Sequence, residues 1–162
     1  MKKRGQQTTE MPFGIIFAVF LIVIFIIIAF NVTKNFLEVG DCSSVGLFYN
    51  ELQSEVDDIW SSQAGEKDFE INLPSGIKKI CFGDLTGTIS NPGEDYDSIS
   101  IYDVEEANTF LLPPEKACRM AYKNIKHINI SQISSKNNPY CVDVSQSLKL
   151  KKDFYDKSVL IE

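Results

Sequence analysis

Four cysteines are the side chains in this sequence whose type and number point most directly to chemistry. They are Cys42, Cys81, Cys118 and Cys141. None of them forms the close C-x-x-C pair that is typical of zinc sites, so we expect no metal site. An even number of cysteines predicts two disulfides in an oxidising compartment. Three pairings are open, and we expect Cys42–Cys81 and Cys118–Cys141, because neighbouring cysteines then close local loops.

Catalytic chemistry has little support in the sequence. Most acid–base sites at neutral pH use histidine, and the single histidine, His127, lies in a polar segment typical of a protein surface. The acidic loop 94–97 lacks the alternating spacing of an EF-hand calcium loop. The chain has no G-x-S-x-G, H-E-x-x-H or P-loop motif. We therefore expect neither an enzyme nor a protein that holds a cofactor or metal.

An apolar run near the N-terminus predicts a membrane-spanning helix. Residues 11–30 read MPFGIIFAVFLIVIFIIIAF and contain no charge. A helix of this length spans about 30 Å, the thickness of the hydrocarbon core of a bilayer. The run is too long for the core of a cleaved secretory signal, and no small-x-small site follows it. We therefore expect a transmembrane helix over residues 11–32.

The charges around this run predict its orientation. Lys2, Lys3 and Arg4 precede it, and only Lys34 follows it closely. The positive-inside rule then places the N-terminus in the cytoplasm and the C-terminal domain outside the plasma membrane. Beyond residue 30 the chain carries 13 basic and 21 acidic residues, so its surface repels phosphate backbones and we expect no nucleic-acid partner. Asn129, in an Asn-Ile-Ser sequence, is a candidate glycosylation site.

The residues in front of the apolar run carry a resemblance. Arg4 and Gly5 are followed by Gln6, then by Thr8 and by Glu10 at the edge of the helix. This pattern resembles the class III signal sequence of archaeal type IV pilins and archaellins. The resemblance implies that a prepilin-type peptidase cuts after Gly5 and leaves Gln6 as the new N-terminus. It also implies that Glu10 pairs with the new α-amino group of a neighbouring subunit, so that the apolar helix can assemble.

The segment after the membrane predicts an amphipathic helix over residues 33–63. Its apolar side chains recur at steps of three or four. They are Phe36, Val39, Cys42, Val45, Phe48, Leu52, Val56 and Ile59. We expect Trp60, at the end of this stripe, to pack in the core or stalk rather than to bind a ligand.

The remainder of the chain predicts mainly β-structure. A polar linker is expected over 61–67, followed by a hairpin of strands 69–73 and 77–82 around the turn at 74–76. Apolar–polar alternation and turn residues predict further strands at 98–103, 108–112, 128–130, 140–144, 148–152 and 158–161. We leave 116–128 open between a short helix and irregular structure.

These elements define an α+β architecture. We expect a basic leader (1–10), a transmembrane helix (11–32), an amphipathic helix or stalk (33–63) and a mainly β extracellular domain (64–162). The helix would pack on a small, mainly antiparallel sheet or sandwich. An extracellular enzyme is the weakest of three possible functions, and two others remain open. One is a pilin-like archaeal surface protein that self-assembles or joins other pilin-like subunits. The other is an uncleaved single-pass protein whose disulfide-bonded ectodomain binds a partner or has a structural role in the envelope.

Overall fold

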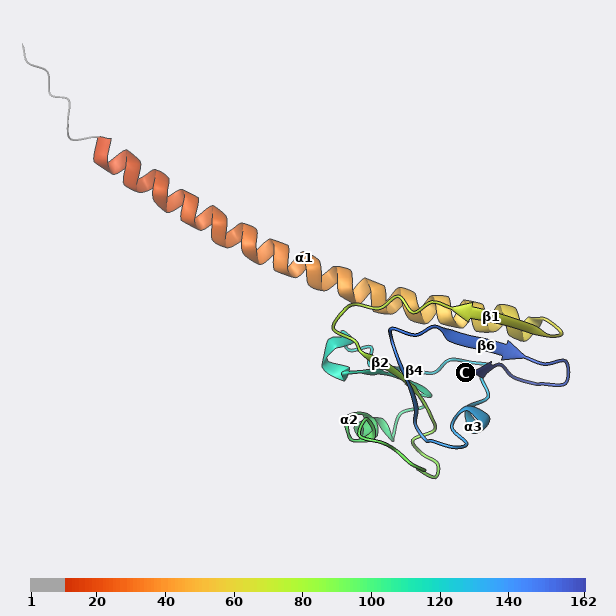
Figure 1. Cartoon of the computed structure of the whole chain (residues 1–162). Coiled ribbons are helices and arrows are strands. Elements are labelled where there is room, and N and C mark those ends of the chain that lie inside the picture. The colour runs from red at the N-terminus through yellow and green to blue at the C-terminus, as the bar shows by residue number, and fades with distance from the viewer. Residues whose placement is uncertain (1–10) are drawn as a thin grey trace, which may run out of the picture. The chain divides into compact units, whose positions relative to one another are not determined.

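The computed structural model describes residues 11–162, apart from the side chains of residues 11–13, 37 and 38. The chain divides into two compact units between Gly40 and Asp41. One long helix, α1 (Met11–Ser61), contributes residues to both units, and the strands belong to the second (Figure 1).

The first unit is the apolar part of α1. Between Gly14 and Phe36 every side chain is exposed except that of Ile24, which is half-buried. No residue of the most apolar 18-residue window is buried within the structure. A core helix of a soluble protein buries at least one face, so this segment does not behave as one. By length and composition it can cross a membrane.

The part of α1 that lies in the second unit is amphipathic, as predicted. Val45, Phe48, Leu52, Val56 and Ile59 are all buried. Their spacing of three or four residues places them on one face of the helix. Phe36 and Val39, which were expected in the same stripe, are 76% and 67% exposed. The stripe therefore becomes a core face only after Asp41, where the second unit begins.

Two antiparallel sheets build the second unit. The larger has the order β4-β3-β2-β5, with β2 (Lys79–Phe82), β3 (Thr109–Leu112), β4 (Tyr122–Lys123) and β5 (Tyr140–Asp143). The smaller has the order β1-β6-β7, with β1 (Gly65–Phe69), β6 (Leu148–Lys152) and β7 (Leu160–Ile161). The mainly antiparallel α+β character was predicted correctly. The predicted strands 108–112, 140–144, 148–152 and 158–161 correspond to β3, β5, β6 and β7.

Short helical turns connect these strands. They are α2 (Tyr96–Ile99), η1 (Ser100–Tyr102), η2 (Pro114–Lys116) and α3 (Ile130–Ile133). The strand predicted over 98–103 is wrong, because this segment forms α2 and η1. Ile99 and Ile101 suggested a period of two, but Ile99 is fully buried whereas Ile101 is 69% exposed. The strand predicted over 128–130 is reduced to one parallel bridge between Ile128 and Val159.

The predicted hairpin of 69–73 with 77–82 is also wrong. β1 begins at Gly65, inside the predicted linker, and pairs with β6 rather than with β2. Its sequence, Gly-Glu-Lys-Asp-Phe, has one buried apolar side chain, Phe69. A strand so polar has no alternation to recognise, because its stability comes from a partner far away in the sequence.

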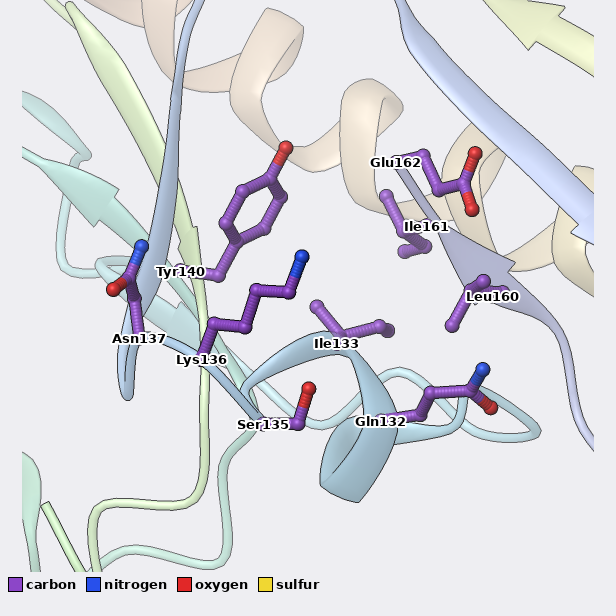
Figure 2. A pocket seen from close by; sticks show the side chains of 9 residues that line it. All are labelled: Gln132, Ile133, Ser135, Lys136, Asn137, Tyr140, Leu160, Ile161 and Glu162. Atoms are coloured by element: carbon purple, nitrogen blue, oxygen red, sulfur yellow. The ribbon is translucent and has the colours of Figure 1, made fainter. Parts of the chain in front are cut away.

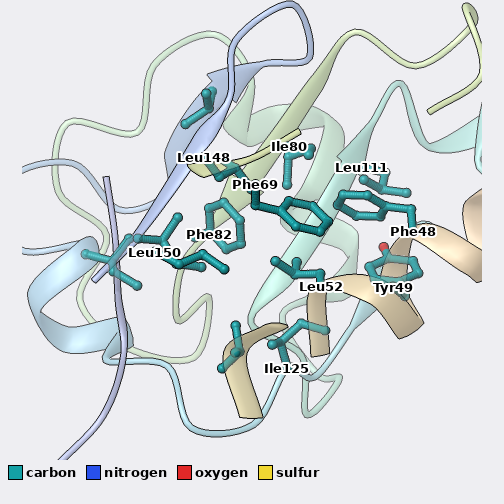
Figure 3. Close-up of a cluster of buried hydrophobic side chains, with 14 of the residues drawn as sticks. Phe48, Tyr49, Leu52, Phe69, Ile80, Phe82, Leu111, Ile125, Leu148 and Leu150 are labelled. Atoms are coloured by element: carbon teal, nitrogen blue, oxygen red, sulfur yellow. The ribbon is translucent and has the colours of Figure 1, made fainter. Parts of the chain in front are cut away.

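The hydrophobic core lies between α1 and the strands of both sheets (Figure 3). Phe48 of α1 packs against Phe69 of β1, with ring centroids 6.0 Å apart. Phe82 and Leu111 from the larger sheet and Leu148 and Leu150 from β6 belong to the same cluster. A helix packed on small sheets therefore supplies the rigid frame for the surface sites described below.

Candidate functional site

Both disulfides lie in the second unit. Cys42 bonds to Cys118 and Cys81 bonds to Cys141, so the pairing expected from the sequence is wrong. Cys81 in β2 and Cys141 in β5 are directly opposite in the antiparallel register, with their Cα atoms 4.0 Å apart. Strand register, rather than loop length, therefore selects Cys141 as the partner of Cys81. Sequence separations of 76 and 60 residues correspond to about 4 kcal/mol of stabilisation per bridge in the chain-entropy model.

The Cys42–Cys118 bridge fixes one loop of the second unit to α1. Close to it, the buried Tyr49 hydroxyl donates a hydrogen bond of 3.1 Å to the carbonyl of Met120. Burial raises the pKa of Tyr49 well above its ordinary value, so this hydroxyl stays a donor at physiological pH. Cys118 and Arg119 have positive φ angles of 53° and 64°, and the bridge and hydrogen bond hold the loop in this uncommon conformation.

His127 packs against side chains near the C-terminal end of α1. Its ring stacks on Trp60 with centroids 3.7 Å apart, and its Nδ1 lies 3.0 Å from Oδ1 of Asp57. The indole nitrogen of Trp60 donates to the carbonyl of Lys157. No nucleophilic hydroxyl or thiol is among these contacts. Within residues 11–162, the structure contains no group of three or more side chains able to hold a metal ion.

The acidic loop 94–97 forms an ion pair instead of a ring of free carboxylates. Asp95 accepts a hydrogen bond of 2.7 Å from the Lys79 ammonium. This contact, the largest influence on the group, raises the pKa of Lys79 above its ordinary value. Tyr96 and Asp97 belong to α2. The loop is thus tied to β2, and one of its charges is already paired.

A pocket of about 330 Å³ opens between β5, α3 and β7 (Figure 2). Polar groups from Gln132, Ser135, Lys136, Asn137, Tyr140 and Glu162 line it, together with Ile133, Leu160 and Ile161. Its volume is within the usual range for ligand sites, which are apolar pockets with a few placed polar groups. The sequence analysis missed it, because its residues come from three segments that only the fold brings together.

The predicted processing and assembly residues lie outside the described part of the chain. They are Arg4, Gly5, Gln6 and Glu10. The predicted glycosylation residue, Asn129, is half-buried and caps α3. Its Oδ1 accepts from the backbone N–H of Gln132, and its Nδ2 donates to the side-chain oxygen of the same residue. The nitrogen that would carry a glycan therefore already has a structural partner.

Comparison with known proteins gives no assignment, since no family model, curated protein or solved structure matches the chain. The function must be inferred from the apolar helix, the disulfide-bonded unit and the surface of that unit.

Proposed function

We propose that this chain is a pilin-like, membrane-anchored surface protein of an archaeon, processed after Gly5 and assembled through its apolar helix. The observation that carries the proposal is the exposed apolar part of α1. Every side chain from Val19 to Val23 and from Phe25 to Phe30 is solvent-exposed in the single chain. So much apolar surface is unstable in water, and a bilayer or the helices of other subunits would cover it.

The disulfides support the proposed location of the second unit. Bridges persist outside the cytoplasm and are rare within it. All four cysteines follow the apolar part of α1 and are bonded, whereas the basic residues Lys2, Lys3 and Arg4 precede it. Both features favour a cytoplasmic N-terminus and an extracellular second unit.

Glu10 has a defined role in this proposal. A carboxylate at the edge of an apolar helix is costly unless it is paired. Cleavage after Gly5 would create an α-amino group on Gln6, and this group on one subunit could neutralise Glu10 on the next. The charge pair would then set the axial register between packed helices, while the apolar side chains supply the contact area.

The second candidate function is an uncleaved single-pass protein whose ectodomain binds a partner. The pocket between β5 and β7 is the observation that favours it. The two candidates share the anchor and the fold and differ in the fate of residues 1–5.

Mass spectrometry of the protein from native membranes separates the two. We expect a mature chain that begins at Gln6, and we expect Gly5→Phe to retain the leader while still inserting into the membrane. Glu10→Gln should be processed but should fail to form filaments, whereas Glu51→Gln, on the exposed surface of α1, should behave as wild type. A native chain that keeps Lys2 to Gly5 would contradict the pilin-like proposal and leave the anchored ectodomain.

A further inference from the structure

The pocket between β5, α3 and β7 carries two opposite charges that do not pair with each other. The side chains of Lys136 and Glu162 both line it, and Figure 2 shows them on opposite sides of the pocket. Neither takes part in an ion pair within residues 11–162. The pocket therefore offers an ammonium on one side and a carboxylate on the other.

The lysine closest to Glu162 in the sheet already has another partner. Lys149 exchanges two backbone hydrogen bonds with Glu162, but its ammonium forms an ion pair with Glu66. Glu66 is the largest influence that raises the pKa of Lys149, and the charge of Glu162 is the smallest. The carboxylate of Glu162 thus remains available to a ligand.

The surface between the two charges is apolar. Ile133, Leu160 and Ile161 contribute to the lining of the pocket (Figure 2). Ile133 and Ile161 are 9% and 2% exposed and belong to the hydrophobic core, which holds them in place. An aliphatic group placed on this floor would gain free energy by leaving water.

The two charges together decide which kind of ligand the pocket accepts. A simple anion next to Lys136 would also meet the carboxylate of Glu162, and a simple cation next to Glu162 would meet the ammonium of Lys136. An uncharged ligand would displace water from both groups without replacing it, which costs free energy. A ligand with both a carboxylate and an ammonium gives each of them a partner.

The size of the pocket limits the distance between those two ligand groups. Its volume of about 330 Å³ equals that of a sphere about 9 Å across. The charged groups of an α-amino acid lie about 3 Å apart, and one charge-assisted hydrogen bond of about 2.8 Å at each end brings the span to about 9 Å. A peptide separates its terminal charges by at least one further residue, about 3.5 Å, and is therefore too long.

We propose that this pocket binds a free α-amino acid with an aliphatic side chain. The carboxylate of the ligand binds the ammonium of Lys136, and its ammonium binds the carboxylate of Glu162. Its side chain packs on Ile133 and Ile161. The site belongs entirely to the second unit and does not depend on cleavage after Gly5, so the pilin-like proposal and this one can fail separately.

The test titrates L-leucine into the full chain, labelled with ¹⁵N, in detergent micelles. We expect amide shift changes centred on Tyr140 and Ile161. Isocaproate, which lacks the ammonium of leucine, and leucinamide, which lacks the carboxylate, should each bind at least tenfold more weakly. Leucyl-glycine should also lose at least tenfold, because its two charges lie too far apart. The absence of shifts with leucine, or equally tight binding of any of the other three compounds, would overturn the proposal.

Variants of the protein test the same two contacts. Lys136→Gln and Glu162→Gln should each weaken leucine binding at least tenfold, whereas Lys157→Gln, at an exposed lysine on the β6–β7 loop, should bind as wild type. Lys136→Glu combined with Glu162→Lys should recover binding that either change alone removes, because a reversed amino acid again has a partner for each charge. Unchanged amide shifts away from the pocket would show that the variants fold. Equal binding by the Lys136→Gln and Lys157→Gln variants would contradict the assignment.

Discussion

Asn138 holds the loop that connects β2 to α2. Its side chain is 4% exposed, and its Nδ2 donates to the carbonyls of Asp84 (2.8 Å) and Thr88 (3.0 Å). Its backbone N–H donates to the carbonyl of Ser90. The side-chain amide and the backbone N–H of Asn138 thus satisfy three backbone acceptors of this loop.

Replacing Asn138 should therefore destabilise the second unit more than replacing its exposed neighbour Asn137 does. Asn138→Ala leaves two carbonyls without their donor, and we expect the free energy of unfolding to fall by about 1–3 kcal/mol. Asn137→Ala is the control, because surface substitutions usually change stability by less than about 0.5 kcal/mol. Denaturant titration of both variants measures the difference. Equal stabilities would show that the side chain of Asn138 does not hold the loop.

Two aspartates make part of the stability depend on pH. The Thr86 hydroxyl and then its backbone N–H hold the pKa of Asp84 below its ordinary 3.8. The backbone N–H and hydroxyl of Ser145 do the same for Asp143. A carboxyl whose pKa is lower in the folded state contributes stability that is present above its unfolded value. That contribution is lost as the pH falls below about 4 and passes through the folded value.

We therefore expect the free energy of unfolding to decrease steadily below about pH 4. Asp84→Asn should flatten this decrease, because asparagine has no charge to lose. Thr86→Val should flatten it in part, since valine keeps the shape of threonine and lacks the hydroxyl donor. Denaturant titrations between pH 3 and pH 7 provide the measurement. A wild-type slope in both variants would mean that this turn does not contribute to the acid sensitivity.

At the scale of elements, the sequence predicted what a single segment can determine. The buried stripe of α1 was recognisable because Phe48, Leu52 and Val56 follow the helical repeat. β3 and β6 were recognisable because their apolar residues stand between turns. In contrast, β1 and α2 depend on contacts with distant segments. The polar β1 is a strand because β6 pairs with it, and one turn of helix buries Ile99 against β3 and its neighbours.

The candidate sites divide in the same way, into those formed by one continuous segment and those that the fold assembles from distant segments. The apolar helix and the residues that resemble a signal sequence are contiguous, so the sequence shows them directly. The pocket combines α3, the start of β5 and β7, which are separate segments of the sequence, so no single stretch of residues indicates it. The disulfide pairing also depends on which strands lie next to each other, because β2 pairs with β5 across 60 residues.

The pairing of the cysteines can be tested by peptide mapping without reduction. Trypsin cleaves after Lys67, Lys79, Lys116 and Lys136, which places each cysteine in a different peptide. We expect the peptide of Cys42 to be linked to the short peptide 117–119, and the peptide that begins at Ile80 to be linked to the one that begins at Asn137. Mass spectrometry before and after reduction identifies the links. A link between the peptides of Cys42 and Cys81 would contradict the strand register that pairs β2 with β5.

At the scale of the whole molecule, the exposed apolar segment and the folded core belong to different parts of the chain. Both sheets, both disulfides and both core clusters lie after residue 40. The apolar surface that water disfavours lies before it, at Ile15 to Phe36. Among the side chains of the first unit that the structure describes, none belongs to the buried core. The structure therefore predicts that the first unit can be removed without loss of the fold of the second.

A fragment of residues 34–162 tests this division. It keeps Cys42 and the whole buried stripe of α1, so we expect it to fold in water with the same two disulfides. Its near-ultraviolet circular dichroism should match that of the full chain in detergent, because Trp60 remains stacked on His127. The full chain should stay with the membrane after alkaline carbonate extraction, whereas the fragment should be soluble. A fragment that aggregates, or whose cysteines pair differently, would show that the apolar helix is needed for folding as well as for anchoring. Carbonate release of the full chain would instead remove the case for a spanning helix, since peripheral proteins are released and spanning ones are retained.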